Sequence, residues 1–242
     1  MKIRGILFDK DGTILDYART WVPINREAAL HAASGDEALA AELLRAHGQD
    51  PDTGAVVGGS LLAAGSIAEI ADAFASHLGE RTPANLTPDL DRVFTEGGAK
   101  HAVLIPGVER TLATLKRRGL RIGVATNDSI GGLKASLQRT GILDLFEFAA
   151  GFDSGHGTKP DPGMALAFCK AVGLEPCEIA VVGDAAHDLA MGRAAQAGLT
   201  VGVLSGTGTA GQLEPLADLM VDSINDLPAK PQFGKRGWRL FA

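Results

Sequence analysis

The chain of 242 residues predicts an α/β fold, with a doubly wound parallel sheet and an inserted helical segment. From about residue 100 onward, short apolar runs alternate with amphipathic segments of helical spacing. The apolar runs are continuous and do not alternate with polar residues, which is typical of parallel strands covered on both faces. One more apolar run, at 3–8, precedes a long segment in which only helical patterns occur. Together these patterns favour a Rossmann-like core with an α-helical insertion.

The first strand is expected at 3–8, where the run IRGILF stops at Asp9. The segment that follows is rich in Ala and Leu, and amphipathic helices are expected there at 24–33, 36–48 and 66–79. A lone strand cannot bury both of its faces, so the strand at 3–8 must join the later sheet. We therefore expect a core of 1–15 and 100–227, a helical unit of 16–99, and a basic tail of 228–242. The tail either docks Trp238 and Phe241 or stays loose.

Strands and helices alternate through the rest of the chain. A helix is expected at 105–119, with Pro106 near its first turn and Gly119 after its last. Further strands are expected at 120–128, 146–153, 178–184, 200–205 and 219–223. Helices are expected between them at 129–141, 161–173, 185–198 and 209–217. This order matches strand–helix–strand units of a parallel sheet.

The composition excludes several function classes. With 45% hydrophobic and 21% charged residues, the chain resembles ordinary globular proteins. Its formal net charge of −6 argues against a nucleic-acid partner, and no apolar stretch is long enough for a membrane span. The spacing of Cys169 and Cys177 is not that of metal ligands, and two cysteines do not form a disulfide framework in a chain of this length. We expect a cytoplasmic protein that is a monomer or a homodimer.

Polar residues gather where the predicted strands end, which is the edge at which open parallel sheets bind ligands. They are Asp9 and Asp11, then Thr126, Asn127 and Asp128, then Asp153, Ser154 and Lys159, and finally Asp184 and Asp188. Each alone fits a helix cap or a surface position. The whole set suits Mg²⁺ and a phosphate group, because carboxylates bind that ion and lysine and hydroxyl donors bind phosphate. Lys10, His156 and His187 are given no catalytic role, and Lys10 is expected to point away from one of the two acids beside it.

The chain resembles the haloacid dehalogenase-like phosphohydrolases, whose four motifs occur here in order. They are DKDGT at 9–13, VATN at 124–127, TKPDP at 158–162 and GDAAHD at 183–188. The resemblance covers 1–15 and about 100–225, and the helical insert is similar to the α-helical cap of the phosphoglycolate phosphatase-like subgroup. An acid at the position of Asp11 favours phosphate chemistry over dehalogenation.

The resemblance implies a Mg²⁺-dependent phosphatase that forms an aspartyl-phosphate on Asp9. Asp11 would give a proton to the leaving alcohol and then take one from water. By the same resemblance, the catalytic residues are Asp9, Asp11, Thr126 and Lys159. The implied metal ligands are Asp9, the main-chain carbonyl of Asp11, Asp184 and Asp188. The implied phosphate-binding residues are Asp9, Gly12, Thr126, Asn127 and Lys159.

A small cap implies a small phosphorylated metabolite as substrate, and the subgroup favours phosphoglycolate. The expected specificity residues, near the cap entry and in the VVGGS turn, are Arg19, Trp21, Arg26, Gly59 and Ser60. An arginine there would bind a substrate carboxylate as a fork. Sugar-phosphate phosphatase and phosphomutase activities stay open. A phospho-accepting receiver domain is disfavoured by the helical insert and the late acid pair, and a silent binding module by the presence of every motif residue.

Overall fold

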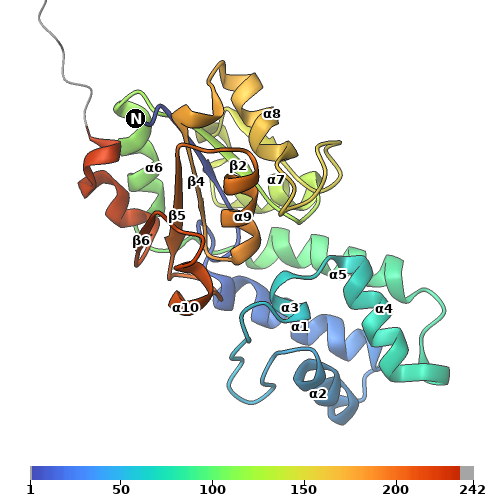
Figure 1. Ribbon diagram of the computed structural model, residues 1–242. Helices are drawn as coiled ribbons and strands as arrows, with labels where there is room; N and C mark the ends of the chain where they lie inside the picture. Colours follow the sequence, from blue (N-terminus) through green and yellow to red (C-terminus); the bar gives the residue numbers. More distant parts are fainter. Residues whose placement is uncertain (1, 235–242) are drawn as a thin grey trace, which may run out of the picture.

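The computed structural model describes residues 2–234, and it shows an α/β core with a helical region beside it (Figure 1). Six strands form one parallel sheet in the order β3-β2-β1-β4-β5-β6. The strands are β1 Gly5–Phe8, β2 Arg121–Ala125, β3 Phe148–Ala150, β4 Ile179–Gly183, β5 Leu199–Val203 and β6 Leu219–Val221. The predicted fold class is thereby confirmed. The strand at 3–8 is central in the sheet, as its apolar sequence requires.

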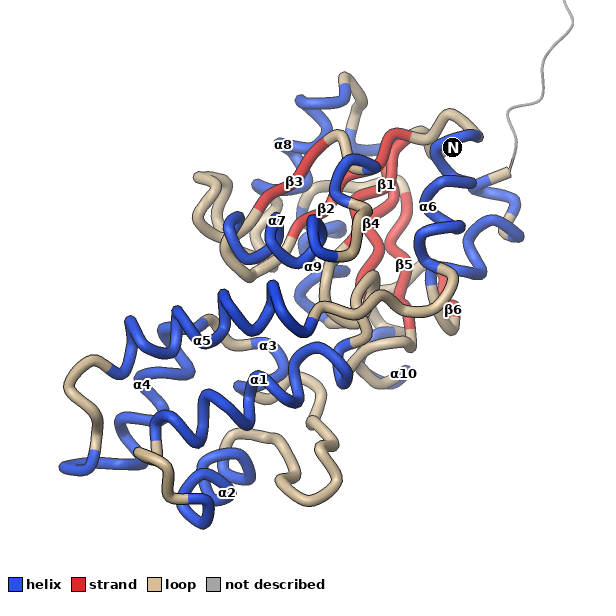
Figure 2. The backbone as a smooth tube through the Cα atoms, turned by 180° about the vertical axis from the view of Figure 1, so that it is seen from behind, coloured by secondary structure: helices blue, strands red, loops and turns tan. Residues whose placement is uncertain are grey.

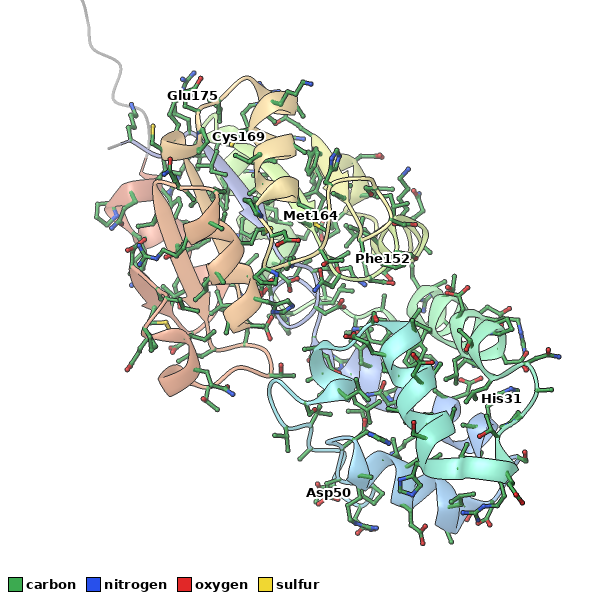
Figure 3. All side chains as sticks on the ribbon, turned by 45° about the vertical axis from the view of Figure 1, so that its right-hand side comes forward. His31, Asp50, Phe152, Met164, Cys169 and Glu175 are labelled. Atoms are coloured by element: carbon green, nitrogen blue, oxygen red, sulfur yellow. The ribbon has the colours of Figure 1, made fainter. Side chains whose placement is uncertain are left out.

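Helices cover both faces of the sheet, which is what a doubly wound fold requires. The core helices are α6 Val108–Arg117, α7 Ile130–Arg139, α8 Gly163–Val172, α9 Ala186–Ala194 and α10 Ala210–Leu213. Phe8 and Val124 pack with Leu112 of α6 and Leu133 of α7 on one face. Leu7 and the other strand residues of the opposite face pack against α9 and against α8, which contains Met164 and Cys169 (Figure 3).

The helical region has its own apolar cluster, separate from the two clusters at the sheet. Its helices are α1 Tyr17–Ala32, α2 Glu37–Ala46, α3 Leu61–Ala64, α4 Ile67–Leu78 and α5 Leu86–His101. The long helices α1 and α5 lie side by side (Figure 2). Gly97 permits this close packing, since a Cβ there would lie 2.8 Å from Ile24 Cγ1. Short 3₁₀ turns occur at Gly79–Arg81, Leu143–Leu145, Pro176–Glu178, Ile224–Ala229 and Pro231–Phe233.

Two chain segments connect the helical region to the sheet, and they run side by side. Leu15 and Leu104 form an antiparallel bridge, and the Asp16 N–H donates to Val103 O over 2.8 Å. Because α5 ends at His101, the helices extend two residues beyond the predicted limit of 99. The division into a 16–99 unit and a core stays a prediction.

Three local findings differ from the sequence expectations. Helix α1 begins at residue 17, well before 24, because Asp16 caps it by accepting the Arg19 N–H. Helix α5 was not among the expected helices, since Pro88 and two glycines interrupt its pattern. Phe233, in the tail, is fully buried, whereas Trp238 and Phe241, for which docking and a loose end were both left open, lie outside the described residues. Within 2–234, no helix is long and apolar enough to cross a membrane.

Candidate active site

The register of the central strands brings the motif residues to one edge of the sheet. Phe8 of β1 pairs with Val124 of β2 and with Val182 of β4. The residues that follow these strands therefore emerge at the same level, and the Asp9 N–H donates to Val182 O over 2.8 Å. Asp184 follows β4 directly. Sequence separations of more than a hundred residues thus become neighbouring positions in space.

Three buried carboxylates gather at this edge. Asp9, Asp184 and Asp188 each offer a carboxylate oxygen within 4.8 Å of the other two. Lys159 Nζ lies 2.5 Å from Asp9 Oδ1 and 2.7 Å from Asp188 Oδ1. Asp188 stands in the first turn of α9, and its other oxygen accepts the Ala185 N–H over 3.0 Å. This cluster holds more negative charge than its lysine can neutralise.

The protonation equilibria reflect that excess of negative charge. Burial raises the pKa of Asp9 well above its ordinary value, although Lys159 opposes the rise. Burial and the neighbouring Asp188 carboxylate raise the pKa of Asp184 to about 7. For Asp188, burial acts in the same direction, but the Lys159 ammonium more than offsets it and the pKa falls. A cation bound by the carboxylates would relieve this cost, and three buried carboxylates suit a divalent ion that prefers oxygen ligands.

Close backbone approaches make room for Asp184. Gly12 has φ of +79°, and a Cβ there would lie 2.5 Å from Asp184 Oδ2. A Cβ on Gly206 would overlap the same oxygen. The Thr207 N–H donates to Asp184 Oδ2 over 2.8 Å, and Ser205 Oγ donates to Gly12 O over 2.7 Å. The loop after β5 therefore fixes this carboxylate, although the sequence motifs did not point to it.

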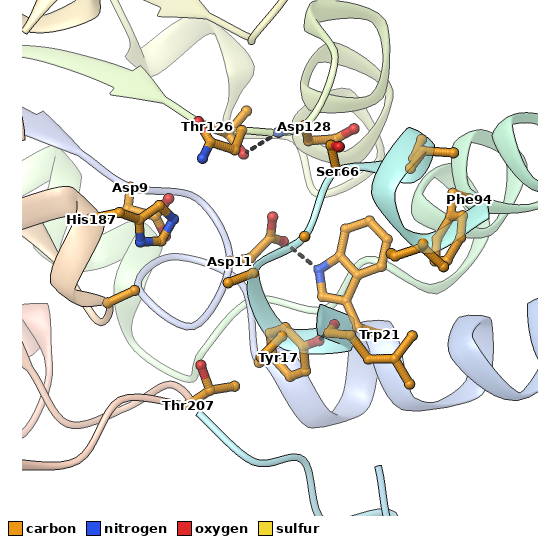
Figure 4. Close-up of a pocket in the computed structure, with 18 of the residues that line it drawn as sticks. Asp9, Asp11, Tyr17, Trp21, Ser66, Phe94, Thr126, Asp128, His187 and Thr207 are labelled. Carbon is orange, nitrogen blue, oxygen red and sulfur yellow. Dashed lines mark hydrogen bonds between the residues drawn. The ribbon is translucent and has the colours of Figure 1, made fainter. Parts of the chain in front are cut away.

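A second charged network lies beside the acid cluster and includes Lys10. Its fully buried Nζ is 3.0 Å from Asp11 Oδ2 and 2.7 Å from Asp128 Oδ2. Trp21, in α1, donates its indole N–H to Asp11 Oδ1 over 2.6 Å (Figure 4). The same indole ring lies 5.0 Å from Lys10 Nζ, measured to the ring centroid. The helical region thus contacts the core motif directly, and Lys10 contacts one of the two acids beside it.

The pKa values in this second network follow from burial and pairing. Burial lowers the pKa of Lys10, but the carboxylates of Asp11 and Asp128 raise it by more, so the net change is upward. Burial raises the pKa of Asp11, and Lys10 and Trp21 oppose that rise. Lys10 is therefore a permanent cation at neutral pH. Sequence reasoning missed this role because nothing local reveals that Asp128 lies within its reach.

Two residues expected to bind phosphate have other partners. Asn127 Oδ1 accepts the Lys159 N–H over 2.9 Å, and its Nδ2 donates to Lys159 O over 3.3 Å. Its side chain thus holds the backbone of Lys159, whose bond to Pro160 is cis. The Gly12 N–H donates to Leu15 O over 2.8 Å. Gly12 leaves room for a neighbouring carboxylate at the site, and the Asn127 amide positions the backbone of Lys159.

Of three further core residues singled out in the sequence, two lie at the site and one lies on the surface away from it. Thr126 is buried, and its Oγ1 accepts the Asp128 N–H over 3.1 Å. His187 lines the cavity above Asp9, where burial lowers its pKa (Figure 4). His156 is exposed, with its ring centroid 6.2 Å from that of Phe148. The sequence expected neither histidine at the site, and His187 is the one that the structure places there.

The expected specificity residues separate into two groups. Trp21 lines the cavity above the acids, and Gly59 lines a wider cavity that adjoins it. Arg19 and Arg26 are exposed and line neither part. Ser60 precedes α3, and its buried Oγ has no partner among the described residues. No arginine of the described chain is therefore placed to bind a substrate carboxylate in this cavity.

Several cavity residues come from the helical region and were not expected. They are Tyr17, Asn25, Leu62, Ile67, Ile70 and Phe94. From the core side the cavity is lined by Phe152, whose place at the edge of the core is visible in Figure 3. These positions read as ordinary core residues of amphipathic helices. Tyr17, an aromatic residue close to the first motif, was the one available signal.

A model of the haloacid dehalogenase-like hydrolase family matches residues 3–196. The chain belongs to this family. The match spans all four motifs and the helical region between the first and second of them. The predicted family and the predicted hydrolase class are thereby confirmed.

The chain is similar to curated relatives in sequence and to a solved structure in fold. The hydrolase is 28% identical over 193 residues to an N-acetylmuramic acid 6-phosphate phosphatase of Pseudomonas putida, covering 80% of this chain and 79% of the relative. It is 33% identical over 140 residues to a phosphoglycolate phosphatase of Salmonella typhimurium, covering 57% and 54%. Its fold matches the crystal structure of a predicted phosphoglycolate phosphatase from Haemophilus somnus with a TM-score of 0.72. That match has 22% identity and covers 94% of this chain and 97% of the other.

Replacing Lys10 by Met should destabilise the hydrolase by about 3–5 kcal/mol, because it leaves the carboxylates of Asp11 and Asp128 partly buried without their cation. Urea unfolding of both proteins measures this difference. Lys134→Met, at an exposed position of α7, is the matched control and should change the free energy of unfolding by less than about 0.5 kcal/mol. If Lys10→Met lowers the free energy of unfolding by less than about 1 kcal/mol, the Lys10 network does not stabilise the protein as proposed.

Proposed function

We propose that this hydrolase is a Mg²⁺-dependent phosphatase that cleaves small phosphate monoesters through an aspartyl-phosphate on Asp9. The observation that carries the proposal is the contact of Lys159 with Asp9 inside a cluster of three buried carboxylates. Such a set combines a carboxylate nucleophile, a fixed cation and metal ligands within one small volume. The names of the relatives, which are phosphatases of small phosphorylated metabolites, support the same activity.

Asp9, Asp184 and Asp188 would hold the metal ion, together with the main-chain carbonyl of Asp11. When bound, Mg²⁺ supplies charge neutralisation for the carboxylates and for the phosphoryl oxygens. The chemistry of the donors supports this choice, because the pKa of Asp9 is raised well above its ordinary value and that of Asp184 to about 7 without a cation. Asp9 must be ionised to attack, so the site as built needs a compensating positive charge.

In the first step, one Asp9 oxygen attacks phosphorus and the bond from phosphorus to the leaving oxygen breaks. Asp11 gives its proton to the departing alkoxide, and burial favours the protonated form of this acid by raising its pKa. Lys159 stays charged and keeps the Asp9 carboxylate in place, since Asn127 holds its backbone. Thr126 provides a hydroxyl for a phosphoryl oxygen. Positioning and fixed charge supply most of what phosphoryl transfer needs.

In the second step, water attacks the phosphorus of the aspartyl-phosphate, and the bond between phosphorus and Asp9 breaks. Asp11, now ionised, accepts the proton of that water. Inorganic phosphate leaves, and both acids return to their starting states. The Trp21 indole and Lys10 hold the Asp11 carboxylate through both transfers. They act as positioning residues, because each acts through the Asp11 carboxylate.

The identity of the leaving group stays a prediction. The relatives are named for two different substrates, phosphoglycolate and N-acetylmuramic acid 6-phosphate, so their names alone do not select one. Phosphoglycolate is the substrate that the subgroup resemblance favours. Sugar-phosphate phosphatase and phosphomutase activities share the same core chemistry, and product analysis separates them: a mutase yields an isomerised phosphate ester, and a phosphatase yields inorganic phosphate.

Asp9→Asn should lower kcat for 4-nitrophenyl phosphate with Mg²⁺ by at least about a thousandfold, because the amide is a poor nucleophile. Asp72→Asn, at an exposed position of α4, is the matched control and should keep the activity of the natural protein. Release of nitrophenol measures both. Retention of more than a tenth of the activity by Asp9→Asn would remove Asp9 as the nucleophile.

Trp21→Phe should move the alkaline limb of the pH dependence of kcat/KM to higher pH. The indole hydrogen bond lowers the pKa of Asp11, so its loss raises that pKa. Asp11 donates a proton in the first step, and activity falls as pH rises through its pKa. A more basic Asp11 stays protonated to higher pH.

Phe94→Leu is the control for packing in the same cavity, because the Phe94 and Trp21 ring centroids lie 6.1 Å apart. It leaves the indole hydrogen bond in place and should leave the alkaline limb unmoved. An unshifted limb in Trp21→Phe, or an equal shift in Phe94→Leu, would show that the indole does not tune Asp11.

A further inference from the structure

The cavity above the acid cluster has a composition that bears on the leaving group. It is partly open to solvent, with a volume of about 110 Å³, and admits a group of the order of one small ring. Its walls toward the helical region include the apolar side chains Leu62, Ile67, Ile70 and Phe94. We propose that the substrates are phosphate monoesters whose leaving alcohol is uncharged and apolar, and that carboxylated esters such as phosphoglycolate are poor substrates. This inference rests on the phosphatase function proposed above.

No cation faces the leaving-group side of the cavity among the described residues that line it. Arg19 and Arg26, the arginines expected from the sequence to bind a substrate carboxylate, are exposed and lie outside the cavity. Lys10 and Lys159 lie at the core side, and each is already paired with two carboxylates. A substrate carboxylate would therefore enter without a partner, which a buried charge requires.

The polar side chains of the cap that line the cavity are also engaged. Tyr17 donates its hydroxyl to Leu62 O over 2.5 Å. Asn25 Nδ2 donates to Gln49 Oε1 over 2.9 Å, and the Trp21 indole donates to Asp11. These hydrogen bonds are made inside the protein, and the other cap side chains around the cavity are mainly hydrocarbon.

Charge in the adjoining cavity, which shares Ser66 and Ile67 with the first, acts in the same direction. Its walls include Glu69 and Asp91 of the helical region, and Lys159, the one lysine among its described lining residues, is already paired with two carboxylates. Glu69 Oε2 accepts the backbone N–H of Ser66 over 2.7 Å and its hydroxyl over 2.8 Å, at the start of α4. This hydrogen bonding lowers the pKa of Glu69, so the carboxylate is ionised at neutral pH. The first turn of α4 is thus already occupied by an anion, and a second would be repelled.

Benzyl phosphate and 4-carboxybenzyl phosphate test the proposal, because they differ in one remote carboxylate and share a benzylic leaving oxygen. With Mg²⁺ at neutral pH, kcat/KM should be at least about thirtyfold higher for benzyl phosphate. Phosphoglycolate and ethyl phosphate should differ in the same direction. Equal values, or a preference for the carboxylated esters, would overturn the substrate class and leave the phosphatase function standing. No turnover of any of these esters or of 4-nitrophenyl phosphate would overturn the phosphatase function itself.

A gain-of-function variant tests the charge argument directly. Ile67 is half-buried and lines both the cavity and the wider one that adjoins it. Ile67→Lys supplies the missing cation and should raise kcat/KM for 4-carboxybenzyl phosphate relative to benzyl phosphate by about tenfold. Ile67→Met, an uncharged change of similar length, should leave the ratio of the two esters within about threefold. An unchanged ratio in Ile67→Lys would show that charge does not select the leaving group.

Discussion

The crowding of buried carboxylates around Lys159 is the constraint on which the rest of this molecule depends. Asp9, Asp184 and Asp188 face one another at the end of the sheet, and one ammonium group serves two of them. Like charges in such a place are costly unless something binds there. The surrounding chain is shaped to keep the cluster intact, with Gly12 leaving room for a carboxylate that the loop after β5 holds.

The helical region completes the site from the other side. Trp21 hydrogen-bonds Asp11, and Asp11 in turn pairs with Lys10. The helical region therefore contacts Asp11 through one indole, and much of its wall over the cavity is apolar. Because α1 and α5 are joined to the sheet by two adjacent segments, this contact depends on how the helical region sits against the core. In the proposed mechanism, the placement of the helical region would thus affect the general acid through this indole.

Sequence patterns were sufficient for the fold class and for which motif residues meet, because continuous apolar runs and strand-end acids leave few arrangements of a parallel sheet. Sequence patterns did not predict the role of a residue where that role depends on which atoms its side chain contacts in the folded protein. Asn127 bears the right group for phosphate, yet its amide holds the backbone of Lys159. Lys10 stands between two acids, yet it pairs with Asp128, more than a hundred residues away. The cap lining was likewise hidden, since its residues look like any amphipathic helix core.

Thermal unfolding with and without Mg²⁺ tests the central claim without relying on activity. The account predicts that millimolar Mg²⁺ raises the Tm of the natural protein, because the ion binds only the folded cluster. Asp184→Asn removes one of the crowded charges, so its Tm without metal should be higher than that of the natural protein and should respond little to Mg²⁺. A metal site built from these carboxylates would be contradicted if Mg²⁺ left the Tm of the natural protein unchanged. It would also be contradicted if Mg²⁺ raised the Tm of Asp184→Asn as much as that of the natural protein.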